Sequence, residues 1–309
     1  MAAVSALLLL PLIAVPAQAA FRGRNGHIAW AYSTWPTPSG SGSFAVTQVN
    51  PATGQTSFEA GCSEVGDCAE WSSISYSPDG RKVLWVTVPD GDAAITVMNS
   101  NFSAPVTIDH PDENDTQASF SPNGRRIIFV RTIHGRSEVV TSNVAGGDAR
   151  VVGGLPSHAM SPKFFPSGRA ILFTRHNTIW SARSDGRDAR PLIRGGTAPD
   201  ISPDGRSIAY VGVNSGLIYL ANANGTRQRA VSLRGALCRP DTCDGVPAEA
   251  VVFSPDGRKL AFAWGSIPDG LDDPTLYTVP VTGGTIKQIG DAYSYNGGNT
   301  TALSWQPLH

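Results

Sequence analysis

The sequence predicts an all-β fold, a six-bladed β-propeller of four-stranded antiparallel blades, from three observations. Glycine and proline are abundant, with 33 and 23 residues among 309, which suits many short strands joined by tight turns. A five-residue turn phrase returns along the chain at a period typical of propeller blades. The two ends of the chain supply complementary halves of one further unit, which indicates a closed ring.

The turn phrase has the form Ser-Pro-Asp-Gly-Arg. Proline fixes φ at the first central position, aspartate or asparagine hydrogen-bonds its own backbone, and glycine accepts a positive φ, so each copy reverses the chain tightly. An apolar residue precedes each copy and an apolar strand such as 83–86 follows it, which predicts a hairpin of two buried strands. The copies occupy residues 77–81, 121–125, 165–169, 202–206 and 254–258.

A second turn follows each hairpin and gives four strands per unit. Examples lie at 143–148, 184–187, 222–225 and 281–284. The phrase glycines, Gly80, Gly124, Gly168, Gly205 and Gly257, lie 37 to 52 residues apart, as expected for blades. Residues 25–30 resemble the second half of a unit and residues 302–307 the first half. Five complete units and one split unit therefore predict six blades, with the C-terminal strand completing the N-terminal blade.

Small side chains predominate on the predicted innermost strands, where six sheets converge on an axis. The positions two residues before each turn hold Ser75, Ser119, Lys163, Asp200, Val252 and Ser304. Lys163 and Asp200 are the large, charged exceptions on neighbouring strands. We expect them to form an ion pair beside the channel that fixes geometry rather than taking part in chemistry.

The first residues predict an export signal. Residues 1–19 contain no charged side chain, are apolar from residue 4 to residue 15, and end in Ala17-Gln18-Ala19, a pattern that signal peptidase accepts. A retained membrane anchor is the alternative, but the apolar run is short for a bilayer and contains two prolines. We therefore expect cleavage after Ala19, a periplasmic or extracellular location, and a single propeller over residues 20–309 with no membrane span.

The cysteines agree with an exported chain because they form two close pairs. Cys62 with Cys68 and Cys238 with Cys243 predict two local disulfides, as in an oxidising compartment. Their spacings differ from the C-x₂-C pattern of zinc sites. We expect neither a structural metal nor a cofactor.

An aromatic residue, the Ser-Pro-Asp-Gly-Arg phrase, an apolar strand and a later Asn/Asp-x-x-Gly turn together resemble the repeat of the TolB-type (WD40-like) β-propellers. The resemblance covers essentially all of residues 20–309 and implies the fold. It does not select a function, because similar blades occur in periplasmic scaffold proteins, in prolyl-oligopeptidase-type peptidases and in some lyases. We expect no counterpart of the N-terminal α/β domain of TolB, so the resemblance does not imply a role in the Tol–Pal system.

Enzyme classes require residues that the sequence can be searched for. The G-x-S-x-G motif of a propeller-bearing peptidase does not occur. A metal hydrolase or lyase needs histidines and carboxylates converging on the axis, and only His110 and His158 precede innermost strands, as weak metal candidates. Residues 112–115 are acidic but lack the spacing of a calcium loop, so we expect a solvated loop.

The long loops are expected on one face of the disc, together with the two cysteine-clipped loops. There we expect an aromatic platform for a glycan or an extended peptide. The alternative is that these side chains pack as a lid over a blade junction. The platform residues are Trp35, Tyr293 and Tyr295, with Asp269, Asp272, Asp273 and Asn296 as polar partners.

The nearly equal numbers of basic and acidic residues limit the classes of partner that the sequence predicts. Lys+Arg number 24 and Asp+Glu 25, so the chain as a whole generates no field that attracts nucleic acid or an anionic membrane. The sequence therefore predicts an exported, monomeric propeller that acts as a non-catalytic protein- or glycan-binding or assembly module. The alternative is a hydrolase or lyase acting at the channel mouth.

Overall fold

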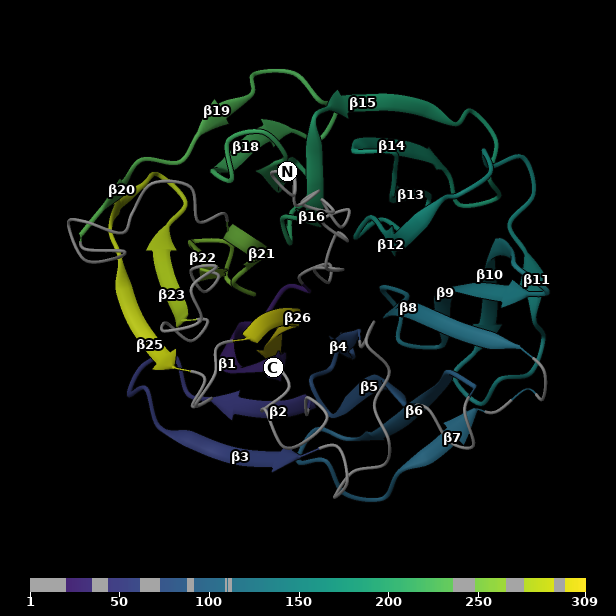
Figure 1. Cartoon of the computed structure of the whole chain (residues 1–309), viewed down its shortest axis with the longest axis horizontal. Helices are drawn as coiled ribbons and strands as arrows, with labels where there is room; N and C mark the ends of the chain where they lie inside the picture. The colour runs from purple at the N-terminus through teal and green to yellow at the C-terminus, as the bar shows by residue number, and fades with distance from the viewer. Residues whose placement is uncertain are drawn as a thin grey trace, which may run out of the picture.

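A computed structural model describes residues 21–34, 44–61, 73–87, 92–108, 110, 113–235, 248–264, 275–291 and 298–309. Six four-stranded sheets surround a central axis, which confirms the predicted six-bladed propeller (Figure 1). Neighbouring strands within each blade are antiparallel. Within the described residues no helix has the length and apolar character needed to cross a membrane.

The strands of the first three blades follow one another from the axis outward. Blade I contains β26 (Gly298–Leu308), β1 (Arg24–Thr34), β2 (Phe44–Val49) and β3 (Thr56–Gly61). Blade II contains β4 (Ile74–Tyr76), β5 (Lys82–Thr87), β6 (Ala94–Asn99) and β7 (Val106–Ile108). Blade III contains β8 (Asn114–Phe120), β9 (Arg126–Ile133), β10 (Arg136–Asn143) and β11 (Arg150–Val151).

The remaining blades follow the same plan. Blade IV contains β12 (Met160–Phe164), β13 (Ala170–Arg175), β14 (Thr178–Arg183) and β15 (Arg190–Arg194). Blade V contains β16 (Gly196–Ile201), β17 (Ser207–Gly212), β18 (Ile218–Asn222) and β19 (Arg229–Ala230). Blade VI contains β21 (Ala248–Phe253), β22 (Lys259–Trp264), β23 (Thr275–Pro280) and β25 (Lys287–Asp291). A short parallel pair, β20 (Leu233–Arg234) with β24 (Gly284–Thr285), ties the segment after blade V to blade VI.

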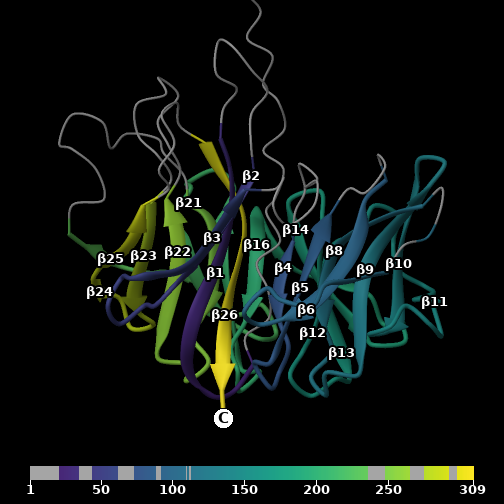
Figure 2. The same ribbon diagram turned by 90° about the horizontal axis from the view of Figure 1, so that it is seen from below.

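Blade I is split between the two ends of the chain, as the sequence predicts. The C-terminal strand β26 runs antiparallel to β1, with Ile28 opposite Trp305 and Arg24 opposite Leu308. The Trp305 indole also donates a hydrogen bond to the Gly26 carbonyl at 3.2 Å. Figure 2 shows β1 and β26 side by side, with the C-terminus at the lower edge of the ring. This pairing closes the ring.

The hydrophobic core consists of layers between neighbouring blades. Successive side chains of a strand point to opposite sheet faces, so a blade strand covered on both faces is apolar throughout. In β1, Ile28 and Trp30 pack against blade VI, whereas Ala29 and Ala31 belong to the layer facing blade II. This is why runs such as 83–86 in β5 are buried at every position.

Three innermost strands carry a β-bulge at the same place, four residues before the turn. Gln117, Ser161 and Ala198 there adopt φ values of 54°, 50° and 46°. A bulge removes backbone N–H groups from the ladder, and buried N–H groups need another acceptor. The preceding blade supplies it, because the Ser73 hydroxyl accepts from the Ala118 N–H at 2.9 Å and the Gln117 amide oxygen accepts from the Ser161 N–H at 2.6 Å. Small polar residues on these strands therefore link the blades as well as fitting the taper.

Lys163 and Asp200 form the predicted ion pair, at 3.5 Å between Nζ and Oδ1. Both side chains are buried, at 1% and 0% exposure. Lys163 Nζ also donates to the Pro199 carbonyl at 2.5 Å, and Asp200 Oδ2 accepts from the Phe253 N–H at 2.7 Å. Burial lowers the pKa of Lys163 and raises the pKa of Asp200 from their ordinary values. The pair thus joins blades IV, V and VI inside the channel wall.

Candidate functional site

The two faces of the ring differ in their connections. We call one the hairpin face; it holds the turns between first and second strands, the turns between third and fourth strands, and the adjoining ends of β1 and β26. It lies at the lower edge in Figure 2. We call the other the loop face; it holds the strand ends joined by 35–43, 62–72, 88–91, 236–247, 265–274 and 292–297, which are not described.

The binding platform and the cysteine pairs predicted from sequence fall in those undescribed segments. The signal segment, residues 1–19, also lies outside the described residues. The residues concerned are Trp35, Asp269, Asp272, Asp273, Tyr293, Tyr295 and Asn296, and Cys62, Cys68, Cys238 and Cys243.

His110 belongs to a charge cluster at the loop face, where blade II connects to blade III. Ligand atoms of His110, Glu113 and Asp115 lie within 4.8 Å of one another, which would suit a metal ion. However, Arg131 already binds them: its guanidinium donates to both Asp115 carboxylate oxygens at 2.8 Å and pairs with Glu113 at 2.8 Å. The expectation of a solvated loop is wrong for Asp115, which is 1% exposed because Arg131 neutralises it. The cluster anchors the entry of β8 to β9.

His158 is exposed and lies near His176 of the same blade, with ring centroids 5.7 Å apart. Among the described residues it does not join the His110 group. The two weak metal candidates are therefore not brought together.

The hairpin face is built from repeated turns, most of which pair a serine hydroxyl with an aspartate or asparagine two residues on. In blade II the Ser77 hydroxyl donates to Asp79 Oδ1 at 2.6 Å, and the Lys82 N–H donates back to Ser77 Oγ at 2.9 Å. The Arg81 N–H donates to the same Asp79 oxygen at 3.1 Å. Equivalent bonds recur at residues 121–126, 202–207 and 254–259.

These bonds set the charge state of the turn carboxylates. The hydrogen bond from Ser202 lowers the pKa of Asp204; burial opposes this, and the Arg206 N–H and the charges of Arg206 and Arg22 add to the lowering. Asp204 is thus ionised and held in place near neutral pH. The same serine–acid pair occurs in three blades, so it is a turn device and not a catalytic pair peculiar to one position.

The turns stack on one another around the axis. A Cβ added at Gly80 would overlap the Pro307 carbonyl oxygen, and one at Gly124 would lie 3.4 Å from Pro78. Gly80 also has φ +69°, which only glycine adopts without strain. Each turn glycine therefore receives the proline of the preceding blade, and the prolines gather at the centre of the face.

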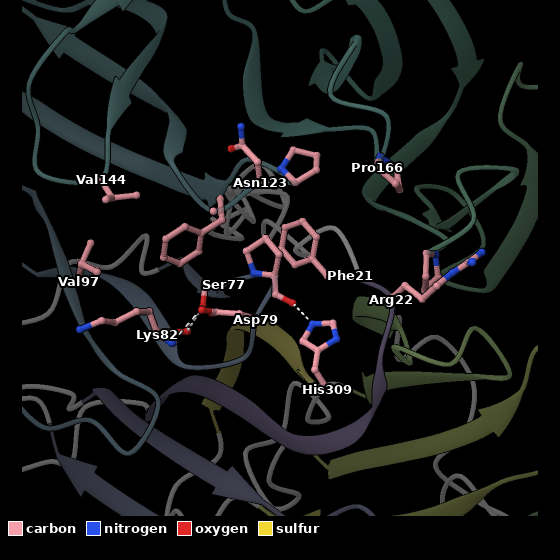
Figure 3. A pocket seen from close by; sticks show the side chains of 15 residues that line it. Phe21, Arg22, Ser77, Asp79, Lys82, Val97, Asn123, Val144, Pro166 and His309 are labelled. Atoms are coloured by element: carbon pink, nitrogen blue, oxygen red, sulfur yellow. Dashed lines mark hydrogen bonds between the residues drawn. The ribbon is translucent and has the colours of Figure 1, made fainter.

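A pocket of about 580 Å³ opens at this centre and takes its walls from four blades (Figure 3). We call it the axial pocket. Its floor is apolar, with Phe21 in the middle of the residues drawn. Its size falls within the range of ligand pockets, roughly 300–1,000 Å³. The apolar lining residues are Phe21, Pro78, Val97, Phe120, Pro122, Val144, Pro166 and Pro203.

The rim of the axial pocket is polar. His309 Nε2 lies 2.6 Å from the Pro78 carbonyl oxygen, and Lys82 Nζ donates to Asn99 Oδ1 at 2.9 Å. Arg22 and Asn123 complete the edge and are exposed. An apolar floor with a charged and polar rim is the general anatomy of a protein-binding surface.

A second hollow, of about 350 Å³, continues outward from the axial pocket between blades III and IV. We call it the III–IV groove. The two share Pro122 and Asn123. The groove is lined mainly by polar side chains, including Ser121, Thr141, Ser167 and Ser184.

Charge is divided unevenly between the faces. The undescribed loop-face segments contain many acidic residues and a single basic one, Arg239. On the hairpin face basic residues outnumber acidic ones by more than two to one, so the net charge of −1 conceals a basic face. Its basic residues are Arg22, Arg24, Arg81, Lys82, Arg125, Arg126, Arg150, Arg169, Arg183, Arg187, Arg190, Arg206, Arg227, Arg229, Arg258, Lys259 and Lys287; its acidic ones are Asp79, Asp148, Asp185, Asp188, Asp204 and Asp256.

Sequence reasoning missed the axial pocket, although it identified the turns that form it. The signal that could have indicated the pocket is the recurring proline of the turn phrase, because Pro78, Pro122, Pro166 and Pro203 line it. The predicted platform rests on loop length instead, and long loops mark the opposite face of the ring.

Comparison with known proteins bears on the fold and the family. TolB from Acinetobacter baumannii superimposes with a TM-score of 0.65 at 17% identity, over 91% of this chain and 67% of that chain. The putative TolB from Agrobacterium tumefaciens gives 0.61 at 17% identity, over 92% and 100%. Hydrazine synthase from Kuenenia stuttgartiensis gives 0.65 at 13% identity, over 93% and 47%. At these identities the likeness concerns the fold alone.

A comparison with curated proteins found no match. The family model described as the TolB beta propeller domain matches residues 63–240, which is more than half of the chain. The match spans the repeated turns of blades II to V. This protein therefore belongs to the TolB β-propeller domain family.

Proposed function

We propose that this protein is an exported, monomeric and non-catalytic binding module that holds a peptide segment of a protein partner in the axial pocket. The observation that carries the proposal is the pocket itself, about 580 Å³ with an apolar floor and a polar rim. Non-catalytic recognition of this kind needs shape and a few polar contacts rather than reactive groups.

The lining favours a peptide over a glycan. Sugar rings are commonly bound on exposed aromatic planes, but Phe21 and Phe120 are only 8% and 2% exposed. The prolines instead offer small apolar surfaces suited to aliphatic or aromatic side chains of a partner. We therefore propose a protein ligand.

The polar groups of the pocket support binding rather than turnover. Ser77 and Asp79 hold the turn, and His309 lies against a backbone carbonyl. A hydrolase would need a nucleophile hydrogen-bonded to a base that is in turn oriented toward substrate. Among the described lining residues, the serine–acid pairs are already committed to backbone N–H groups.

Export is proposed from the leader pattern at residues 1–19 and tested by processing. Mass spectrometry of the protein secreted from a bacterial host is expected to show a chain that begins at Ala20. Recovery of an intact leader on membrane-bound protein would contradict it.

The pocket is tested with a random peptide library displayed on phage and selected on the immobilised protein. Val144 lines the pocket, whereas Val281 occupies the equivalent place in blade VI and does not. Val144→Trp is expected to weaken selected peptides by about tenfold or more because the larger ring fills the pocket, whereas the matched Val281→Trp leaves binding unchanged. Equal effects of the two variants, or no selected peptide, would overturn the proposal.

The loop-face platform stays a prediction and forms a second arm of the same screen. Combined alanine substitution of Trp35, Tyr293 and Tyr295 removes the proposed aromatic surface. If this variant loses peptides or glycans that Val144→Trp still binds, the ligand site lies on the loop face. If binding survives and only the melting temperature falls, those aromatics have a packing role.

A further inference from the structure

The arginine of each turn phrase is exposed and directly follows the turn glycine. Gly124 lines the axial pocket and Gly168 lines the III–IV groove, so Arg125 and Arg169 each follow a lining residue. Arg81, Arg125, Arg169, Arg206 and Arg258 occupy the same position in blades II to VI. Their backbone N–H groups bond the turn side chains, but among the described residues none of their guanidinium groups has an ion-pair partner within 4.0 Å. These five cations therefore recur around the hairpin face, one in each of the blades II to VI.

Two of the turns lack the acid that accompanies the arginine elsewhere. Asn123 stands in place of the aspartate in blade III, and Ser167 does so in blade IV. Asn123 accepts the same Arg125 N–H bond, at 3.1 Å, without a negative charge. The positive charge of Arg125 and Arg169 is thus not offset within their turns, unlike that of Arg81, Arg206 and Arg258.

The same two turns border the III–IV groove. Asn123, Ser167 and Gly168 line it, and it runs into the axial pocket at Pro122 and Asn123. The two turn arginines without a turn acid therefore directly follow residues that line the continuous hollow. The Ser184 side chain adds a hydroxyl group along the groove.

Resting on the function proposed above, we infer that the ligand is an acidic peptide segment: an apolar side chain fills the axial pocket, and carboxylates lie in the III–IV groove against Arg125 and Arg169. Arginine forks match carboxylates in geometry and charge. An extended peptide advances roughly 3.3 Å per residue, so a few residues join the two hollows.

Single-stranded nucleic acid fits this surface less well. It is typically bound on aromatic platforms along a basic track. Among the described residues, the exposed large apolar side chains are Val106, Ile133, Val151, Met160, Leu217 and Leu308, none of them aromatic. The cations of the turn phrases also recur around a ring of turns rather than following a line.

The test uses three fluorescein-labelled peptides, each about 12 residues long to span both hollows. The acidic peptide carries alternating glutamates beside a central Leu-Phe pair. The neutral peptide has glutamine at every glutamate position, and the third peptide keeps the glutamates but has serines in place of Leu-Phe. Fluorescence anisotropy is measured on the full chain at about 50 and 500 mM NaCl, because exposed ion pairs weaken as the screening length shortens.

The variants pair substitution sites on the two faces. Arg125→Gln/Arg169→Gln removes the groove charges, and Arg136→Gln/Arg194→Gln removes two exposed arginines at the loop-face ends of β10 and β15. We expect the acidic peptide to bind about tenfold more tightly than the neutral one at low salt, and to lose about that factor in the groove variant or at high salt. The loop-face variant should bind as the unmodified protein does.

The outcomes separate this inference from the function on which it rests. If the neutral peptide binds as tightly as the acidic one, and Val144→Trp abolishes both, the pocket function stands and the acidic preference is wrong. If the serine peptide binds as tightly as the Leu-Phe peptide, the attraction is purely electrostatic and the anchored-peptide inference is overturned. If single-stranded DNA or anionic vesicles compete at lower concentration than the acidic peptide, a different polyanion is the ligand.

Discussion

The hairpin face and the loop face connect the strands of the blades in opposite ways. On the hairpin face one phrase repeats, and each turn glycine is fixed by the proline of its neighbour. On the loop face the connections range from the two-residue turn at His176 and Asn177 to undescribed segments such as 265–274. Among the described residues there, a charge cluster around Arg131 anchors the junction of blades II and III. The difference teaches that departures from the repeat, such as Asn123 and Ser167, are the informative positions of the regular face.

The largest loss of stability is expected from a substitution in the channel wall, which runs between the hairpin face and the loop face. Lys163→Met leaves Asp200 buried without its cation, which costs about 3–5 kcal/mol of unfolding free energy. Chemical denaturation measures this loss, and hydrogen exchange is expected to rise on both faces, since the pair joins three blades.

Lys163→Met/Asp200→Asn serves as the control for that substitution. Asparagine keeps an oxygen for the Phe253 N–H and carries no charge, so the double variant should recover most of the loss. A single variant within about 0.5 kcal/mol of the unmodified protein would show that the wall does not depend on this pair.

An intermediate loss of stability is expected when one glycine from each face is replaced by alanine. Gly80 and Gly135 have φ values of +69° and +75°, so alanine is strained at both by about 1–2 kcal/mol. Only Gly80 abuts a neighbour, because nothing lies within 4 Å of a Cβ at Gly135. Gly80→Ala is therefore expected to cost about 1–3 kcal/mol more than Gly135→Ala by chemical denaturation. Equal losses would mean that the turns of the hairpin face do not support one another.

The smallest effect is expected on the stability of the protein at low pH. The lowered pKa of Asp204 means that its stabilising contribution is present above the unfolded-state pKa, about 3.9, and is lost as the pH falls through the folded-state value. Asp204→Asn, which copies the turn of blade III, should change stability at neutral pH by less than about 1 kcal/mol because the group is exposed. Denaturation between about pH 2 and 5 should show less acid sensitivity in this variant, and Asn123→Asp should show more. The reverse pattern would contradict the assigned turn bonds.

Much of the architecture was predictable because the turn phrase carries its own mechanism. Proline and glycine at fixed offsets specify reversals, their spacing gives the blade, and the complementary ends specify the pairing of Ile28 with Trp305. The Lys163–Asp200 pair was predictable because two large charged residues interrupt small ones on adjacent strands.

The candidate site was less accessible from sequence because it depends on contacts between units. The phrase explains why Pro78 turns the chain but not that it packs beside Gly124 of the next blade. The burial of Asp115 depends on Arg131, sixteen positions away on the next strand. Net charge likewise averages over both faces, so it concealed the basic hairpin face.

The seam between β1 and β26 has a mechanical consequence. Arg24 and Leu308 are paired neighbours, so tension applied to the chain just outside them acts across the strands and not along them. A force in this direction breaks the hydrogen bonds between the two strands one after another. It is smaller than the force that shears the same strands past each other, which breaks many of these bonds at once. The ring is therefore expected to open at a low force when it is pulled at the paired ends of β1 and β26.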